Sequence, residues 1–212
     1  MLRLSWIITM YIFLILLAGF SGIGGACFEL HKAKVSGQVI GFSVMLNLSM
    51  GIYFAVMCGY LSSGFRAIKC DSTGGALGMI LACFIMGRIV PAAKKDIYRA
   101  YFLFMPQVYG IGKLACAYKG CCGGAIIHGK RVPVQLIEAI SFIVLFLISV
   151  YLVEKDSFKP GVLVMVCTVL KFLLDFLRDT HKEGIFSFNQ GACLVTFAIL
   201  LCIFAIDRKA LF

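Results

Sequence analysis

Long apolar runs alternate with short polar segments along the whole chain. Residues 4–28, 36–65 and 184–206 include no Asp, Glu, Lys or Arg. A helix of about twenty apolar residues crosses the hydrocarbon core of a bilayer, so this pattern predicts transmembrane helices. On that measure we expect about seven of them, over residues 4–28, 38–60, 73–93, 101–118, 134–153, 161–177 and 190–206.

The four prolines refine these predicted helices. Pro133 and Pro160 stand where two helices should begin, since proline fits the first turn of a helix. Pro91 and Pro106 fall inside predicted helices and should kink or break them. The connecting segments are short and none has the composition of a linker. We therefore expect residues 1–212 to form a single polytopic transmembrane domain of the all-α class.

Composition supports a membrane protein and argues against a nucleic-acid partner. The mean hydropathy is +0.99 and 14% of the residues are charged, which is outside the range of a soluble domain. The formal net charge is +10, but Lys and Arg gather at the ends of apolar segments, where cations meet anionic lipid head groups. The loops on the two sides carry nearly equal numbers of Lys and Arg, so charge does not define the orientation.

Several ionisable residues nevertheless lie inside the predicted helices or at their edges. An ionised side chain in the hydrocarbon region costs about 2.5–3.5 kcal/mol on insertion scales, so such residues are functional candidates. We expect them to line a cavity within the helices. They are Arg88, Lys113, Glu138, Lys171, Asp175 and, close behind, Arg178.

Three of these residues share one helix face. Lys171, Asp175 and Arg178 stand at positions i, i+4 and i+7. Two interpretations are open: Lys171 and Asp175 neutralise each other and hold the helices together, or Asp175 orients both cations toward an anionic head group. Arg88 is ambiguous in another way, since it lies near a helix end and its side chain can extend to the membrane surface.

The segment 110–124, GIGKLACAYKGCCGG, gathers polar and reactive residues in an otherwise apolar chain. Lys113 follows Gly110 and Gly112. Alone it would be a lysine that extends to the surface, but beside exposed backbone N–H groups it would bind phosphate. The glycines favour an anion site at a broken helix end. In the next helix Gln135 and Glu138, at i and i+3, can face the same cavity.

The cysteines of this segment, Cys116, Cys121 and Cys122, allow three interpretations. Structural zinc sites use paired C-x2-C spacings with two further ligands, and the chain has no such second pair. A redox thiol pair is the second possibility, and small-residue packing in a tight turn is the third. The pattern favours packing, and no metal or cofactor is expected.

The order of the motifs resembles the prolipoprotein diacylglyceryl transferase family, bacterial membrane enzymes that lipidate lipoprotein precursors. The segment 110–124 resembles the family's G-R-[IL]-G-[NC]-F block ending in G-x-x-x-G, and VPVQLIEA resembles H-P-x-Q-L-Y-E. LKFLLDFLRDTHKEGIFSFNQ resembles F-R-x-x-x-E-F-x-R followed by [LI]-S-x-x-Q. Upstream, TGGALG is similar to H-G-G-L-x-G at the head of a transmembrane helix. The resemblance covers residues 72–206.

The resemblance implies roles for particular residues. Lys113, Lys171, Arg178 and Glu138 stand at catalytic positions, with lysine in place of arginine at the first two. The positions that contact substrate include the head of the third helix and the glycine-rich segment. They are Thr73, Gly74, Gly75, Cys116, Gly120, Cys121, Gly124, Gln135 and Asp175, the last in place of a glutamate.

Other positions depart from the family pattern. Thr73 stands in place of the motif histidine, and Val132 replaces the histidine of H-P-x-Q. Lysine keeps the charge of arginine but loses the fork that binds phosphate through two hydrogen bonds. The base that would deprotonate a thiol therefore has no obvious candidate; His128 is the nearest histidine, and a phosphate oxygen of the lipid is a second option.

In the family, a diacylglyceryl group moves from phosphatidylglycerol to the thiol of a lipobox cysteine, and glycerol phosphate leaves. The resemblance thus implies an enzyme of the bacterial plasma membrane with an anionic phospholipid donor and a prolipoprotein or peptide cysteine as acceptor. Two alternatives are a same-fold enzyme with a different acceptor and a non-catalytic phospholipid-binding membrane protein.

Overall fold

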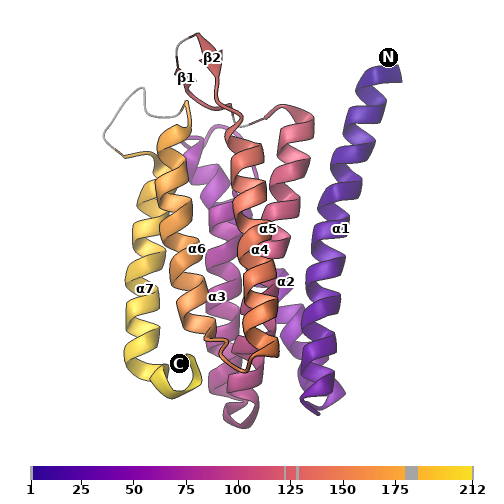
Figure 1. Cartoon of the computed structure of the whole chain (residues 1–212), viewed down its shortest axis with the longest axis vertical. Helices are drawn as coiled ribbons and strands as arrows, with labels where there is room; N and C mark the ends of the chain where they lie inside the picture. Colours follow the sequence, from indigo (N-terminus) through magenta and orange to yellow (C-terminus); the bar gives the residue numbers. More distant parts are fainter. Residues whose placement is uncertain (1, 122, 128, 180–185, 212) are drawn as a thin grey trace.

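The computed structural model describes residues 2–121, 123–127, 129–179 and 186–211, and it is a bundle of roughly parallel helices (Figure 1). The described N- and C-terminal residues lie at opposite ends of the bundle. Short 3-10 turns, η1 (Pro91–Ala93) and η2 (Asp175–Leu177), follow α3 and α6. The helices are α1 (Leu2–Lys32), α2 (Gly37–Ser62), α3 (Ser72–Ile89), α4 (Lys94–Lys119), α5 (Val134–Glu154), α6 (Pro160–Leu174) and α7 (Phe188–Leu211).

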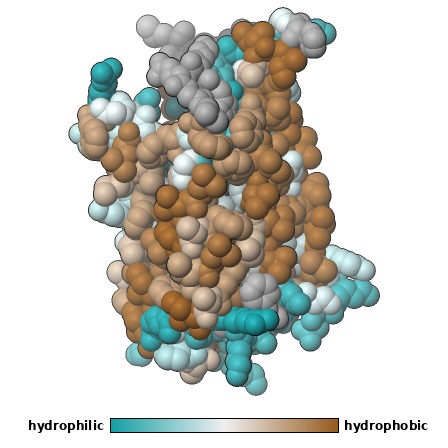
Figure 2. Space-filling view, turned by 90° about the vertical axis from the view of Figure 1, so that its left-hand side faces the viewer, coloured by the Kyte–Doolittle hydropathy of each residue, from teal (hydrophilic) through white to brown (hydrophobic). Residues whose placement is uncertain are grey.

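The expected all-α membrane class is confirmed. Six of these helices are long and apolar enough to cross a membrane, and α4 is the exception. On one face, a broad hydrophobic band lies between more polar ends (Figure 2). The less apolar α4 is the helix that contacts α1, α3, α5, α6 and α7, so its polar groups are shielded by protein.

The prolines act largely as the sequence predicts. Pro133 immediately precedes α5, and Pro160 is the first residue of α6. At Pro91 the expected break occurs, since α3 ends at Ile89 and η1 begins. At Pro106 there is no break: the residue is buried and α4 continues to Lys119.

Two connections differ from the predicted loops. Residues 94–100, expected as a loop because of their charges, form the first turns of α4. The segment is amphipathic, with Ile97, Tyr98 and Ala100 buried and Lys95 exposed. Between α4 and α5 lies a small antiparallel hairpin, β1 (Ile126–Ile127) and β2 (Lys130–Arg131), which the sequence did not predict.

A cluster around Asp207 joins α7 to α3 and α4 at the end of the bundle that holds the C-terminus of the chain (Figure 1). The Asp207 side chain is 1% exposed, and its Oδ1 lies 2.7 Å from Lys94 Nζ and 3.2 Å from Arg88 Nη2. Tyr98 donates its hydroxyl to Oδ2 at 2.8 Å. Arg88 therefore pairs with an acid, although its side chain stays half exposed.

Glycines let α2 and α3 approach closely. A Cβ built on Gly78 would lie 2.3 Å from Met50 O, and one on Gly74 would lie 2.4 Å from Phe54 O. Both contacts are with helix backbone, which cannot rotate away. The spacing of four residues is the small-residue pattern that brings membrane helices together.

Gly78→Ala should therefore push α3 away from α2 and destabilise the protein by about 1–3 kcal/mol. Gly75→Ala on the same helix is the control, because its Cβ would meet Ala55 Cβ at an ordinary 3.6 Å. Thermal unfolding in detergent, followed by a maleimide dye that reacts with newly exposed cysteines such as Cys83, measures both. Equal melting temperatures for the two variants would contradict this packing.

Candidate functional site

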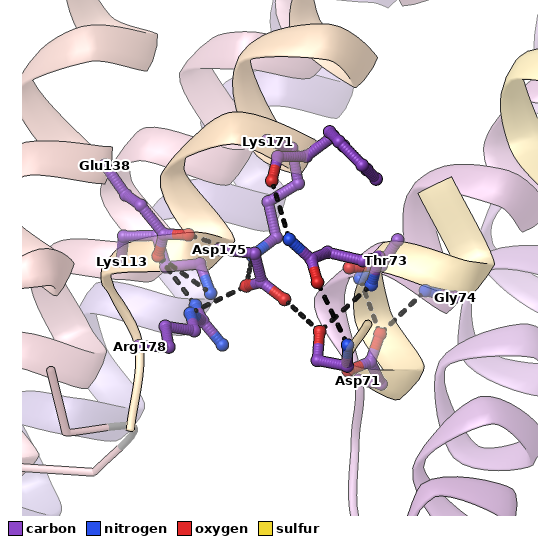
Figure 3. Close-up of polar contacts among 11 residues, drawn as sticks. Asp71, Thr73, Gly74, Lys113, Glu138, Lys171, Asp175 and Arg178 are labelled. Atoms are coloured by element: carbon purple, nitrogen blue, oxygen red, sulfur yellow. Dashed lines mark hydrogen bonds and ion pairs between the residues drawn. The ribbon is translucent and has the colours of Figure 1, made fainter. Parts of the chain in front are cut away.

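Five ionisable residues meet inside the bundle near the end that carries the hairpin (Figure 3). They are Lys113 on α4, Glu138 on α5, Lys171 on α6, Asp175 in η2 and Arg178 directly after η2. All five are buried, with at most 6% exposure, and we call them the charge cluster.

Glu138 is the centre of the charge cluster, since it contacts all three cations. Its Oε1 accepts a hydrogen bond from Lys171 Nζ at 2.9 Å. Its Oε2 accepts one from Arg178 Nη2 at 2.7 Å and lies 3.3 Å from Lys113 Nζ. Helix α5 places this carboxylate, fully buried, between α4 and α6.

Asp175 is the second carboxylate, and it contacts two of the same cations. Its Oδ1 lies 2.6 Å from Lys171 Nζ and 2.9 Å from Arg178 Nε. Lys171, Asp175 and Arg178 do meet, but not on one helix face as expected, because α6 ends at Leu174 and Arg178 has an extended backbone after η2. Both interpretations of this group match the contacts. Asp175 neutralises Lys171, and it also contacts both Lys171 and Arg178, so it can orient the two cations.

The charge cluster has a surplus of positive charge. It brings together three cations and two carboxylates, so it carries a formal charge of about +1 when all five are ionised. A surplus charge buried in an apolar bundle is costly unless a counter-charge is supplied. The arrangement therefore favours binding of an anion.

The start of α7 supports the charge cluster through two residues, Ser187 and Gln190, that were not predicted from the sequence as site residues. Ser187 Oγ donates to Asp175 Oδ2 at 2.7 Å. Ser187 N donates to Gln190 Oε1 at 2.9 Å and Gln190 N donates to Ser187 Oγ at 3.2 Å, which is a capping box. The sequence does contain a signal for this capping box, since Ser187 and Gln190 stand three residues apart just before an apolar run.

The glycine-rich segment after α4 lies against Arg178. Helix α4 ends at Lys119 and is capped by Gly120, which has φ +72°, a left-handed conformation suited to glycine. Gly124 forms a β-bridge with Arg178, and Ala125 N donates to Leu177 O at 2.8 Å. The Gln135 amide donates to Cys121 O. These contacts bring three of the four predicted motifs together.

The expected broken helix lies later than predicted. Gly110 and Gly112 are inside continuous α4, so their amides are in helical bonds and do not surround Lys113. A Cβ on Gly110 would lie 2.9 Å from Ile143 Cγ1, so this glycine serves the contact of α4 with α5. The helix break occurs at Gly120, one residue past Lys119.

The head of α3 lies near the charge cluster (Figure 3). Asp71 caps this helix, since its Oδ1 accepts from Thr73 N at 2.8 Å and Gly74 N at 2.9 Å. Gly74 packs on α2, as above, and Gly75 follows it. Thr73 is 6% exposed, and its Oγ1 has no hydrogen-bond partner within the described ranges.

A small cavity of about 40 Å³ adjoins the charge cluster. Thr73 and Lys171 line its polar part, and Cys167 and Cys193 line its sides together with apolar residues. Lys171 is the one cluster residue in its lining. The other cluster residues, which we expected to line a cavity, pack against one another, because each cation is close to a carboxylate.

A comparison with models of known protein families identifies the family of this chain. The family model for prolipoprotein diacylglyceryl transferase matches residues 70–206, well over half of the chain, including the entire charge cluster. The chain belongs to the prolipoprotein diacylglyceryl transferase family. No curated protein matches it.

Membership in the prolipoprotein diacylglyceryl transferase family makes this a transferase-like protein, and its apolar helices make it a multi-pass membrane protein. The family's substrates are lipids and prolipoproteins in a membrane. Among the residues predicted from the family motifs, Cys116 lies on α4 one turn after Lys113 and is partly buried. Cys121 Sγ lies 3.6 Å from Cys116 O.

Two of the candidate residues from the sequence, Cys122 and His128, lie outside the described residues. Among the residues that are described, no three His, Cys, Asp or Glu side chains are placed to hold a metal ion.

Proposed function

We propose that this chain transfers a diacylglyceryl group from phosphatidylglycerol to the cysteine thiol of a prolipoprotein lipobox, in the bacterial plasma membrane. The observation that carries the proposal is the buried charge cluster with its surplus cation, within the region matched by the family. A phosphodiester is a monoanion and supplies the missing counter-charge. The apolar exterior gives a lipid donor access from the bilayer.

In this mechanism Lys113, Lys171 and Arg178 bind the lipid phosphate and stabilise the charge that develops as glycerol phosphate leaves. Glu138 and Asp175 hold these cations in position, as preorganised charges require. We place the remaining substrate contacts around this group. They come from Thr73, Gly74, Gly75, Cys116, Gly120, Cys121, Gly124 and Gln135.

Complementation tests the proposal in a cell. The chain is expressed in a bacterium whose own diacylglyceryl transferase can be shut off, and growth and lipidation of a reporter lipoprotein are followed. Rescue is the expected result. No rescue, with the chain present in the membrane, would contradict lipoprotein lipidation and leave a same-fold enzyme with a different acceptor or a non-catalytic protein.

One observation favours the non-catalytic alternative, a phospholipid-binding membrane protein. Every cation of the charge cluster already lies near a carboxylate of the chain, so the cluster can serve as a structural network. Lys171→Ala separates the two. A catalytic site should lose transfer, whereas a binding protein that merely keeps the fold should retain its phospholipid affinity and its cellular effect.

A further inference from the structure

The cavity beside the charge cluster is small and largely apolar. Its volume is about 40 Å³, and Lys171 is the one charged residue of its described lining. A single water molecule needs about 10–15 Å³, so the space fits a group of a few heavy atoms. An acyl chain or a peptide segment is too large for it. The apolar wall comes from Ala76, Ile80, Met105 and Phe142.

Two hydroxyl groups of the lining have no hydrogen-bond partner within the described ranges. They are Thr73 Oγ1, on α3, and Tyr109 Oη, on α4, and both atoms are buried. The Ser72 hydroxyl lies near Tyr109 Oη but lacks the geometry of a hydrogen bond. A buried hydroxyl that is left unpaired is costly. The lining therefore favours an occupant that brings polar atoms of its own.

The other two hydroxyls of the lining are already used. Thr168 Oγ1 and Thr196 Oγ1 each donate to a carbonyl one turn earlier in their own helix, at 2.8 Å. The cysteine thiols of the lining are weak donors and weak acceptors. The capacity to bind a polar group is thus concentrated at Thr73 and Tyr109.

The two unpaired hydroxyls lie next to residues that we propose to bind phosphate. Lys171 belongs to both the charge cluster and the cavity lining. Tyr109 stands one turn before Lys113 on α4, and Lys113 Nζ lies 4.9 Å from the centroid of its ring. The Tyr109 ring also packs on Phe142, with the ring centroids 4.3 Å apart, which fixes its position. A phosphate held by Lys113 and Lys171 would therefore have one of its substituents beside this cavity.

We propose that the cavity binds the glyceryl head group of phosphatidylglycerol, through hydrogen bonds between its free hydroxyls and those of Thr73 and Tyr109. This inference rests on the proposed function, which places the phosphate of the same lipid at the charge cluster. Head-group hydroxyls both donate and accept, so each can pair with a side-chain hydroxyl. Thr73 and Tyr109 then determine which donor lipid is used, and no covalent bond changes at them.

The lining disfavours other common head groups. Ethanolamine and choline end in a cation, and the described lining has no carboxylate to pair with it, whereas Lys171 repels it. Phosphatidic acid has no group beyond its phosphate that reaches the cavity. A neutral head group that carries hydroxyls satisfies Thr73 and Tyr109 without adding a charge.

Phosphatidylpropanol tests the proposal, because it has the same phosphodiester charge but its propyl head group has no hydroxyl. The full chain in detergent is titrated with each lipid without an acceptor, and bound lipid is measured by native mass spectrometry. The wild type should bind phosphatidylglycerol about 10²-fold more tightly, and Thr73→Val and Tyr109→Phe should each reduce this preference about tenfold. Equal affinities in the wild type would mean that water pairs with both hydroxyls as well as the lipid does, and would overturn the proposal.

Two further variants separate hydrogen bonding from packing. Thr73→Ser keeps the hydroxyl and should retain most of the preference. Thr196→Val makes the same change as Thr73→Val at a residue of similar burial, 4% against 6% exposed, whose hydroxyl is already used. It should leave the preference intact. A preference lost equally in Thr196→Val and Thr73→Val would be due to the shape of the cavity and would overturn the assignment of Thr73.

Soluble ligands and the transfer reaction separate this proposal from the proposed function. Glycerol phosphate should displace bound phosphatidylglycerol at a lower concentration than propyl phosphate, because the cavity binds the head group and not the acyl chains. Equal displacement would place the selectivity outside the cavity and overturn the proposal. Selective binding without lipidation of a lipobox peptide would contradict the proposed function alone. Lipidation from both lipids at equal rates would contradict the head-group site alone.

Discussion

Replacing Glu138 by glutamine should destabilise the protein by about 3–5 kcal/mol and remove its transfer activity. Glu138 contacts Lys113, Lys171 and Arg178 and has no exposed surface. Glutamine has nearly the same size, so it leaves no cavity. It instead leaves three buried cations with one carboxylate, and uncompensated buried charge is among the most costly defects of a fold.

The loss of activity has a separate cause. Without Glu138 the three cations repel one another, and a displacement of about 1 Å at a reacting centre costs roughly 10²-fold in rate. The melting temperature in detergent and the rate of peptide lipidation measure the two effects. Glu154→Gln, at the exposed end of the same helix, is the control and should change neither. A Glu138→Gln protein with wild-type stability would contradict the role of Glu138 as the centre of the charge cluster.

Asp207→Asn should lower the stability by about 2 kcal/mol while leaving the transfer rate of the folded protein unchanged. Asp207 accepts from Lys94, Arg88 and Tyr98, so asparagine weakens the junction of α7 with α3 and α4. The cost is smaller than at Glu138 because the Lys94 and Arg88 side chains are 24% and 46% exposed and can be solvated.

The same two assays check this prediction. Asp156→Asn is the control, since Asp156 is exposed between α5 and α6, and asparagine tolerates its φ of +54°. A loss of rate in correctly folded Asp207→Asn, with the melting temperature unchanged, would contradict a purely structural role. Together the two variants distinguish a buried carboxylate needed for transfer, Glu138, from one needed only for stability, Asp207.

The helices could be predicted from the sequence because each membrane-spanning helix is a continuous run of apolar residues, which is a local property of the chain. The predicted span 134–153 became α5, Val134–Glu154, and the other spans differ by one to seven residues at each end. The largest error was the segment 94–100, where charged residues suggested a loop. Those charges lie on one face of a helix whose other face is buried, a pattern that average hydropathy conceals.

The site could be predicted only in part, because spacing indicates shared faces but not partners from other helices. The pairing of Lys171 with Asp175 follows from helical periodicity, whereas Arg178 contacts Asp175 from an extended residue after η2. The meeting of Lys113 with Glu138, and of Arg88 with Asp207, depends on packing between segments far apart in the chain. Gly74 likewise looked like a substrate contact, whereas its close approach to Phe54 O is visible only once α2 is in place.

The central claim is that the buried charge cluster serves diacylglyceryl transfer, and its most direct test is the reaction itself. The purified full chain is placed in phosphatidylglycerol vesicles with a synthetic lipobox peptide, and the peptide mass is measured. We predict a mass increase of one diacylglyceryl group, with an equal amount of glycerol phosphate released and no change in a peptide whose cysteine is replaced by alanine. An unmodified cysteine peptide, with the protein folded and retained in the vesicles, would contradict the account.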